Sequence, residues 1–271
     1  MLCLVVTLAT GALFAPGASA EEYGPKSFPE VGRCVKTAPG AGTYINAKCQ
    51  FVAKPETGRF EWISATANEK LKFEGGGGET TIASLGHPSI RCIGFNISGE
   101  WQNEKRANVV VELQGCVDQS AKQCTNVGGT NKSEISSGSL NGELGFIVNQ
   151  GSKIAVGMDL KPPTGQKALF TYECDGEHGL GEQNAIEGSL IGRYKPIQTM
   201  KTTLLMNFKV RKNGTQEVEK FESGLKDTLL TTFKKGFLET LGEAPSTLNV
   251  KEVGGSTSLY EVRVKEVPYT G

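Results

Sequence analysis

Six cysteines that follow an apolar leader constrain the fold of this chain more than any other feature of its sequence. The leader carries no charge over residues 2–14 and ends in Ala18-Ser19-Ala20. Small residues at these positions are typical of a signal peptide, so we expect residues 1–20 to be removed after Ala20. The cysteines of the mature chain are Cys34, Cys49, Cys92, Cys116, Cys124 and Cys174. An even number in an exported protein predicts disulfides, in a secreted or extracellular cell-envelope setting.

Six cysteines can pair in many ways, and the spacing favours short loops first. We predict the pairs Cys34–Cys49, Cys116–Cys124 and Cys92–Cys174. The first two each enclose turn-forming residues, so a hairpin could bring their Cβ atoms to the separation of about 3.5–4.5 Å that a disulfide needs. The third pair is what then remains, and the prediction leaves no free thiol.

Alternating apolar and polar residues predict strands along most of the chain. The alternating rows are residues 93–97, 109–113, 154–160, 170–174, 204–210 and 260–264. Glycine-rich stretches at Gly75 to Gly78, Gly128-Gly129, Gly176 to Gly181 and Gly254-Gly255 fall between rows, where we expect hairpins and loops. We therefore predict an all-β fold of antiparallel sandwich or barrel-like sheets, braced by disulfides, with little helix.

One segment fits two structures. Apolar residues repeat at every fourth position, as on one face of a helix, at Phe221, Leu225, Leu229, Phe233 and Phe237. The glycines within this stretch and the pair Thr231-Thr232 disfavour a helix, so we predict a hairpin that turns at Lys234-Lys235-Gly236, with a helix as the alternative.

For the domains, we expect a disulfide-containing β domain over residues 21–195. Residues 196–271 form a β-rich region that is either separate or part of that domain.

Charge and motifs exclude several functions. The chain has 29 basic and 29 acidic residues, so no long-range field favours nucleic acid or an anionic membrane. No segment after the leader approaches the roughly 20 continuous apolar residues of a membrane-spanning helix. Two histidines, His87 and His178, are too few and too distant for paired zinc ligands, and no catalytic or phosphate-binding motif is present. We expect no metal site and no cofactor.

Two places remain as candidate sites. Trp101 lies among polar residues, where its ring could stack on a sugar or a protein; the alternative is a ring buried over the sheet, as we expect for Trp62. The second place is the acidic loop after Cys174, where a cation or an acid–base pair could be held by Asp175, Glu177, His178 and Glu182. Its alternative is a solvated, glycine-rich loop.

Several short segments resemble a known family. They are residues 29–36, Leu113-Gln114-Gly115-Cys116, residues 140–146, Tyr172-Glu173-Cys174, Gly188-Ser189-Leu190-Ile191 and Lys220-Phe221-Glu222. Together they resemble an uncharacterised family of secreted, cysteine-containing β-rich proteins of soil actinobacteria. The resemblance implies export and a β fold, and it transfers no site residue.

We predict a non-enzymatic binding module for an envelope glycan, polymer or protein. The alternative is a secreted hydrolase that uses the acidic loop.

Overall fold

The computed structural model describes residues 27–66, 68, 71–150, 152–174, 182–212, 215–216, 220–222, 224, 229–235, 239–250 and 253–266. Strands make up most of this part of the chain, and it contains no helix. The strands are β1 (Ser27–Lys36), β2 (Phe60–Ser64), β3 (Lys72–Gly77), β4 (Thr80–Ser84), β5 (Ile90–Cys92), β6 (Gly94–Trp101), β7 (Arg106–Gln114), β8 (Cys124–Asn126), β9 (Glu134–Gln150), β10 (Lys153–Lys161), β11 (Ala168–Cys174), β12 (Glu182–Gly188), β13 (Leu190–Lys195), β14 (Lys201–Asn207), β15 (Leu229–Lys235), β16 (Glu239–Val250) and β17 (Val253–Glu266).

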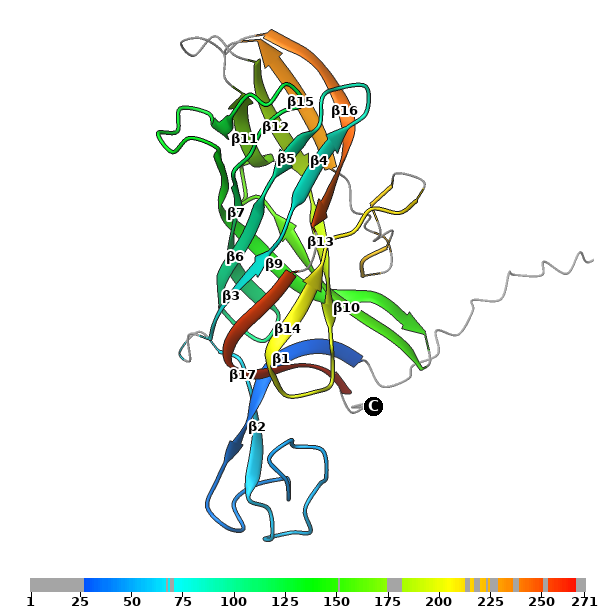
Figure 1. Cartoon of the computed structure of the whole chain (residues 1–271). Helices are drawn as coiled ribbons and strands as arrows, with labels where there is room; N and C mark the ends of the chain where they lie inside the picture. The colour runs from blue at the N-terminus through cyan, green and yellow to red at the C-terminus, as the bar shows by residue number, and fades with distance from the viewer. Residues whose placement is uncertain are drawn as a thin grey trace, which may run out of the picture.

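The strands pair antiparallel in two curled sheets (Figure 1). The larger sheet has the order β14-β13-β10-β9-β7-β6-β3-β17-β1-β2, and the smaller has the order β5-β4-β16-β15-β12-β11-β8. Because β14 also pairs with β17, the first eight strands of the larger sheet form a ring, from which β1 and β2 extend. The predicted all-β, antiparallel and barrel-like fold is confirmed.

The two sheets stack end to end because several strands pass from one into the other. Only Gly78 and Glu79 separate β3 from β4, and only Ser189 separates β12 from β13. The strands beside them make the same passage. β16 pairs with β4 in the smaller sheet, and β17, which follows β16, pairs with β3 in the larger sheet. The result is one elongated body with the smaller sheet above the larger in Figure 1.

Two glycine-rich stretches that were expected to be loops are paired strands instead. Gly75 to Gly77 end β3, where Gly76 pairs with Asn96 of β6 on one side and with Gly254 of β17 on the other. Glycines inside a strand are typical of places where a curled sheet bends sharply, and here they precede the passage from the larger sheet into the smaller one. Gly128-Gly129 does lie in a turn after β8, and residues 176–181 lie outside the described residues.

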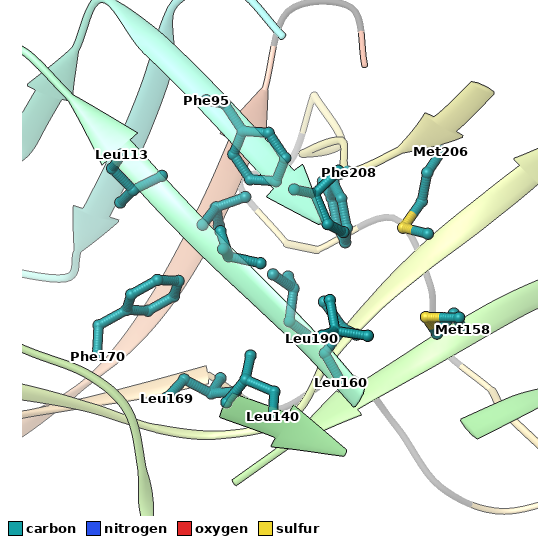
Figure 2. Close-up of a cluster of buried hydrophobic side chains, with 14 of the residues drawn as sticks. Phe95, Leu113, Leu140, Met158, Leu160, Leu169, Phe170, Leu190, Met206 and Phe208 are labelled. Carbon is teal, nitrogen blue, oxygen red and sulfur yellow. The ribbon is translucent and has the colours of Figure 1, made fainter. Parts of the chain in front are cut away.

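One continuous core fills the interior of both sheets (Figure 2). Leu169 and Phe170 come from the smaller sheet, whereas Leu190 comes from the larger sheet, and all three are buried. The Phe95 and Phe208 rings pack with centroids 5.7 Å apart. Both sheets therefore contribute side chains to the same apolar cluster.

The predicted alternation is clear in β7, whereas two other rows depart from it: residues 155–160 of β10 are all buried, and the row at residues 93–97 changes phase. Val109, Val111 and Leu113 of β7 are all buried, as alternate residues on the inner face should be. Ile93, by contrast, is 75% exposed. It lies at a bend between β5 and β6, where the alternation changes phase, because Cys92 before it and Phe95 after it are both buried.

The segment with two predicted structures is a strand over its described part, and the helical alternative is wrong there. β15 pairs with β12 on one side and with β16 on the other. Thr231 is buried and accepts a hydrogen bond from the Ser84 hydroxyl at 3.0 Å. Lys234 and Lys235 still belong to the strand, so the predicted turn starts too early; residues 236–238 lie outside the described residues.

Strands of residues 196–271 alternate with earlier strands in both sheets. β17 lies between β3 and β1, and β15 lies between β12 and β16. Beyond the start of β15, the side chain of Gln216 takes the place of that strand beside β16. The Gln216 amide donates to the Leu248 carbonyl and accepts from the Leu248 N–H, both at 3.0 Å. These two bonds satisfy backbone groups that are costly to leave unpaired when buried.

Three disulfides are present, and their pairing corrects part of the prediction. Cys34–Cys49 is confirmed, but the other pairs are Cys92–Cys116 and Cys124–Cys174. Cys124 stands directly opposite Cys174 in the β8–β11 pair, and Arg91 beside Cys92 bridges to Val117 beside Cys116. Strand register therefore decided the pairing, whereas the prediction weighted short loops. Three disulfides indicate an oxidising setting.

The described residues contain no helix that is long and apolar enough to cross a bilayer.

Candidate functional site

Trp101 is a core residue, so the interpretation of a solvent-facing anchor is wrong. Its side chain is 0% exposed and its ring lies 5.7 Å from that of Phe73. Gly99, two residues earlier on the same face of β6, leaves the space that the Phe73 ring occupies. The signal was present in the sequence, because Phe95, Ile97, Gly99 and Trp101 continue one period-2 row. The polar neighbours belong to the outer face and the following turn.

Trp62 is half-buried, which corrects the expectation of a core position. Its ring covers Gly32 of the neighbouring strand β1, where a side chain would clash with it. The indole N–H donates to Glu30 Oε1, and the Ser64 hydroxyl donates to Glu30 Oε2, both at 2.8 Å. Buried Glu30 thus fixes β2 against β1 at the point where these two strands leave the ring.

Of the four residues of the predicted acidic site, only Glu182 lies in the described part of the chain. Asp175, Glu177 and His178 lie outside the described residues, and Glu182 begins β12 opposite Lys235 of β15. No cluster of three or more His, Cys, Asp or Glu side chains suited to a metal ion occurs in the ranges that the structure describes. The cation and acid–base roles of this loop stay predictions.

A polar hollow of about 240 Å³ lies beside the turn after β8. Asn126, which lines it, donates from its amide to the Ser136 carbonyl and accepts from the Ser136 N–H. Thr125 donates to the Asn131 carbonyl, and Asn131 donates to Glu134. These bonds hold the turn together, so we interpret the hollow as a structural feature.

A buried carboxylate lies on the outer side of the larger sheet. Asp159 of β10 is 1% exposed, stands opposite Glu143 of β9, and forms an ion pair with the more exposed Lys161. Burial raises the pKa of Asp159; Lys161 opposes this shift, and the negative charge of Glu143 adds to it. A raised carboxyl pKa can mark a catalytic group, but structural ion pairs cause it as well.

The raised pKa of Asp159 predicts a dependence of stability on pH. Because the folded state binds this proton more tightly than the unfolded chain, stability should fall as pH rises from the ordinary pKa of 3.8 through the raised value. Asp159→Asn should remove this component and be more stable than wild type at neutral pH, with the difference shrinking as pH falls through the raised pKa toward 3.8 and staying constant below it. Urea unfolding of both proteins across this range measures it. A constant difference at every pH would contradict the prediction.

The most distinctive surface feature is a loop that projects from the body of the protein. β1 and β2 form a ribbon that leaves the ring, and residues 37–59 connect them (Figure 1). We call these residues the projecting loop. The disulfide Cys34–Cys49 ties the middle of the loop to β1, and Thr37 N–H donates to the Arg59 carbonyl where the loop begins.

Close backbone contacts give the projecting loop a defined shape. Gly42 and Gly58 form a bridge, and a Cβ atom on Gly58 would overlap the carbonyl oxygen of Gly42. Tyr44 N–H donates to the Phe60 carbonyl and the Phe60 N–H donates back, so Tyr44 pairs with the edge of β2. Further on, the Ala53 N–H donates to the Thr43 carbonyl. The loop is therefore built like a small folded unit.

Apolar side chains are exposed on this folded loop. The large apolar side chains that are most exposed in the described residues are Ile45, Phe51, Val52, Leu85, Ile93 and Leu205. Half of them fall within the eight residues 45–52, where Ile45, Phe51 and Val52 are 53%, 61% and 71% exposed. Single exposed apolar residues are ordinary, but a cluster on a folded projection is typical of an interaction site.

Register shows how these side chains are arranged. Tyr44 is bridged to Val52, and the Ile45 N–H donates to the Phe51 carbonyl, so Ile45 stands opposite Phe51. Successive residues of a strand point to opposite faces. Ile45 and Phe51 therefore lie on one face of a short hairpin, and Val52 lies with Tyr44 on the other. The sequence held one signal for this, the pairs Tyr44-Ile45 and Phe51-Val52 on either side of Cys49.

Comparison with protein-family models, curated proteins and solved structures finds no match for this chain.

Proposed function

We propose that this chain is an exported, non-enzymatic binding protein of the cell envelope, and that the projecting loop is its contact surface. The observation that carries the proposal is the cluster of Ile45, Phe51 and Val52, exposed on a folded loop at the end of the ribbon. Export is supported by the leader before Glu21 and by the oxidised cysteines, which require an oxidising setting.

A folded loop is suited to binding because little conformational freedom remains to be lost. The disulfide and the contact between Gly42 and Gly58 hold the exposed side chains in place before any partner arrives. Ordering a mobile side chain or loop segment on binding costs about 0.5–1.5 kcal/mol for each side chain. Pre-ordering therefore leaves more of the free energy of apolar burial available for affinity.

The test uses oxidised mature protein and fractionated envelope from an actinobacterium. Ile45→Ser with Phe51→Ser should lower binding to the envelope at least about tenfold, because burying each large apolar side chain contributes about 1.5–3 kcal/mol. Leu85→Ser is the control, since it removes an apolar side chain that is 75% exposed on the turn between β4 and β5. Pelleting assays and a circular dichroism spectrum of each variant measure binding and folding.

Two outcomes would contradict the proposal. One is envelope binding that is equal for the loop variant and wild type, and the other is no binding of wild type to any fraction. The hydrolase alternative gains no support from the described residues, because its loop lies almost wholly outside them.

A further inference from the structure

We infer that the projecting loop binds the surface of an anionic lipid layer, with the side chains of Ile45, Phe51 and Val52 entering the boundary between headgroups and acyl chains. This inference rests on the proposed function, because it names the partner of the same loop. It follows from the local charge of the loop, from the placement of its apolar side chains, and from its defined shape.

The charge of the loop differs from that of the whole chain. The complete sequence is neutral, but within residues 37–59 the basic residues are Lys48, Lys54 and Arg59 and the acidic residue is Glu56. Lys48 and Lys54 lie within three residues of the exposed apolar side chains. Each basic residue near an anionic membrane surface strengthens attraction about fivefold. The rest of the chain has 26 basic and 28 acidic residues, so its net charge of −2 opposes this attraction only weakly.

The apolar side chains favour immersion over contact with one flat surface. Ile45 and Phe51 occupy one face of the short hairpin and Val52 the other, and all are exposed. A flat protein partner would cover one face and leave the other in water. A lipid layer surrounds an inserted hairpin on both faces, so it removes all of this apolar surface from water at once.

Hydrogen bonds within the hairpin also make its backbone compatible with an apolar layer. Polar backbone groups are costly in an apolar layer unless they are hydrogen-bonded. The hairpin meets this need in part through its own bonds, from the Ile45 N–H to the Phe51 carbonyl and from the Ala53 N–H to the Thr43 carbonyl. Interfacial elements enter only about 5–10 Å, so the remaining groups can still reach water and headgroups.

The experiment compares vesicles of phosphatidylcholine alone with vesicles that contain phosphatidylglycerol as well, by co-sedimentation of the oxidised mature protein. Wild type should partition at least about tenfold more strongly onto the anionic vesicles, and added salt should reduce this preference. Ile45→Ser with Phe51→Ser should lower partitioning at least about tenfold, and Leu85→Ser should leave it unchanged.

Charge variants test whether the basic residues of the projecting loop attract it to anionic vesicles. Lys54→Glu should weaken partitioning onto anionic vesicles about fivefold or more and should not change it on neutral vesicles. Lys132→Glu is the matched control, because it makes the same change of net charge at an exposed position in the turn after β8. Equal effects of the two substitutions would overturn the role of the loop.

The outcomes separate this inference from the proposed function. If envelope binding depends on Ile45 and Phe51 but wild type does not bind anionic vesicles, the lipid inference is wrong and the binding function stands. Loss of envelope binding after protease treatment of the envelope would also contradict the lipid inference. It would indicate a protein partner with an apolar pocket. If neither envelope nor vesicles are bound, both proposals fail.

Discussion

Replacing Trp101 with alanine is expected to lower the free energy of unfolding by about 3–5 kcal/mol, because it removes a large ring from a fully buried site. The ring packs against Phe73 at 5.7 Å, in space that Gly99 leaves open. The surrounding structure relaxes only in part around the cavity that such a substitution leaves. Urea unfolding followed by circular dichroism measures the loss, and no loss of binding beyond that caused by unfolding is expected.

Trp101→Phe is the matched control, with an expected cost of no more than about 2 kcal/mol. Phenylalanine keeps one ring against Phe73 and removes the indole N–H, which is buried and has no hydrogen-bond partner in the described part of the chain. Losing an unsatisfied donor offsets part of the lost packing. If alanine were tolerated as well as phenylalanine, or if alanine abolished binding without affecting stability, Trp101 would not be the core residue described above.

Removing the Cys124–Cys174 disulfide with Cys124→Ala and Cys174→Ala is expected to lower the free energy of unfolding by about 4 kcal/mol. The bridge spans 50 residues of sequence and links β8 to β11 within the smaller sheet. Closing a loop of this length restricts the unfolded chain strongly, and the effect grows with loop length. Denaturant unfolding under non-reducing conditions measures the difference from wild type.

The Cys34–Cys49 disulfide provides the comparison. Cys34→Ala with Cys49→Ala should reduce the stability of the body by about 1 kcal/mol or less, because the projecting loop can open locally without disturbing the core. The same variant should weaken binding, since the exposed side chains of the loop are no longer held in place. Equal losses of stability from the two double substitutions would show that the loop and the body unfold as one unit.

Local sequence patterns were sufficient to predict the general architecture. Alternation over residues 109–113 predicts a strand with one inner face, and Val109, Val111 and Leu113 are buried as expected. The choice of strand over helix at residues 229–235 also followed from local composition, through Thr231-Thr232. These features depend on neighbours one or two positions away, so a sequence read along the chain contains them.

Other features depend on which segments meet, and here the sequence was ambiguous. Gly75 to Gly77 look like a loop in isolation, but β6 and β17 provide hydrogen-bond partners on both sides. Trp101 looks like a loop residue among polar neighbours, but the inner face of β6 places it in the core. In both cases a contact distant in the sequence overrides the local preference, as is common in sheets.

The all-β class, the oxidised cysteines and the pair Cys34–Cys49 could be predicted, because they follow from composition and from contacts close along the chain. The pairing of Cys92 with Cys116 and of Cys124 with Cys174 could not, nor could the exposure of Ile45, Phe51 and Val52 and the burial of Trp101. Register and burial arise from strands that meet across long separations in sequence, and no local pattern specifies which strands those are.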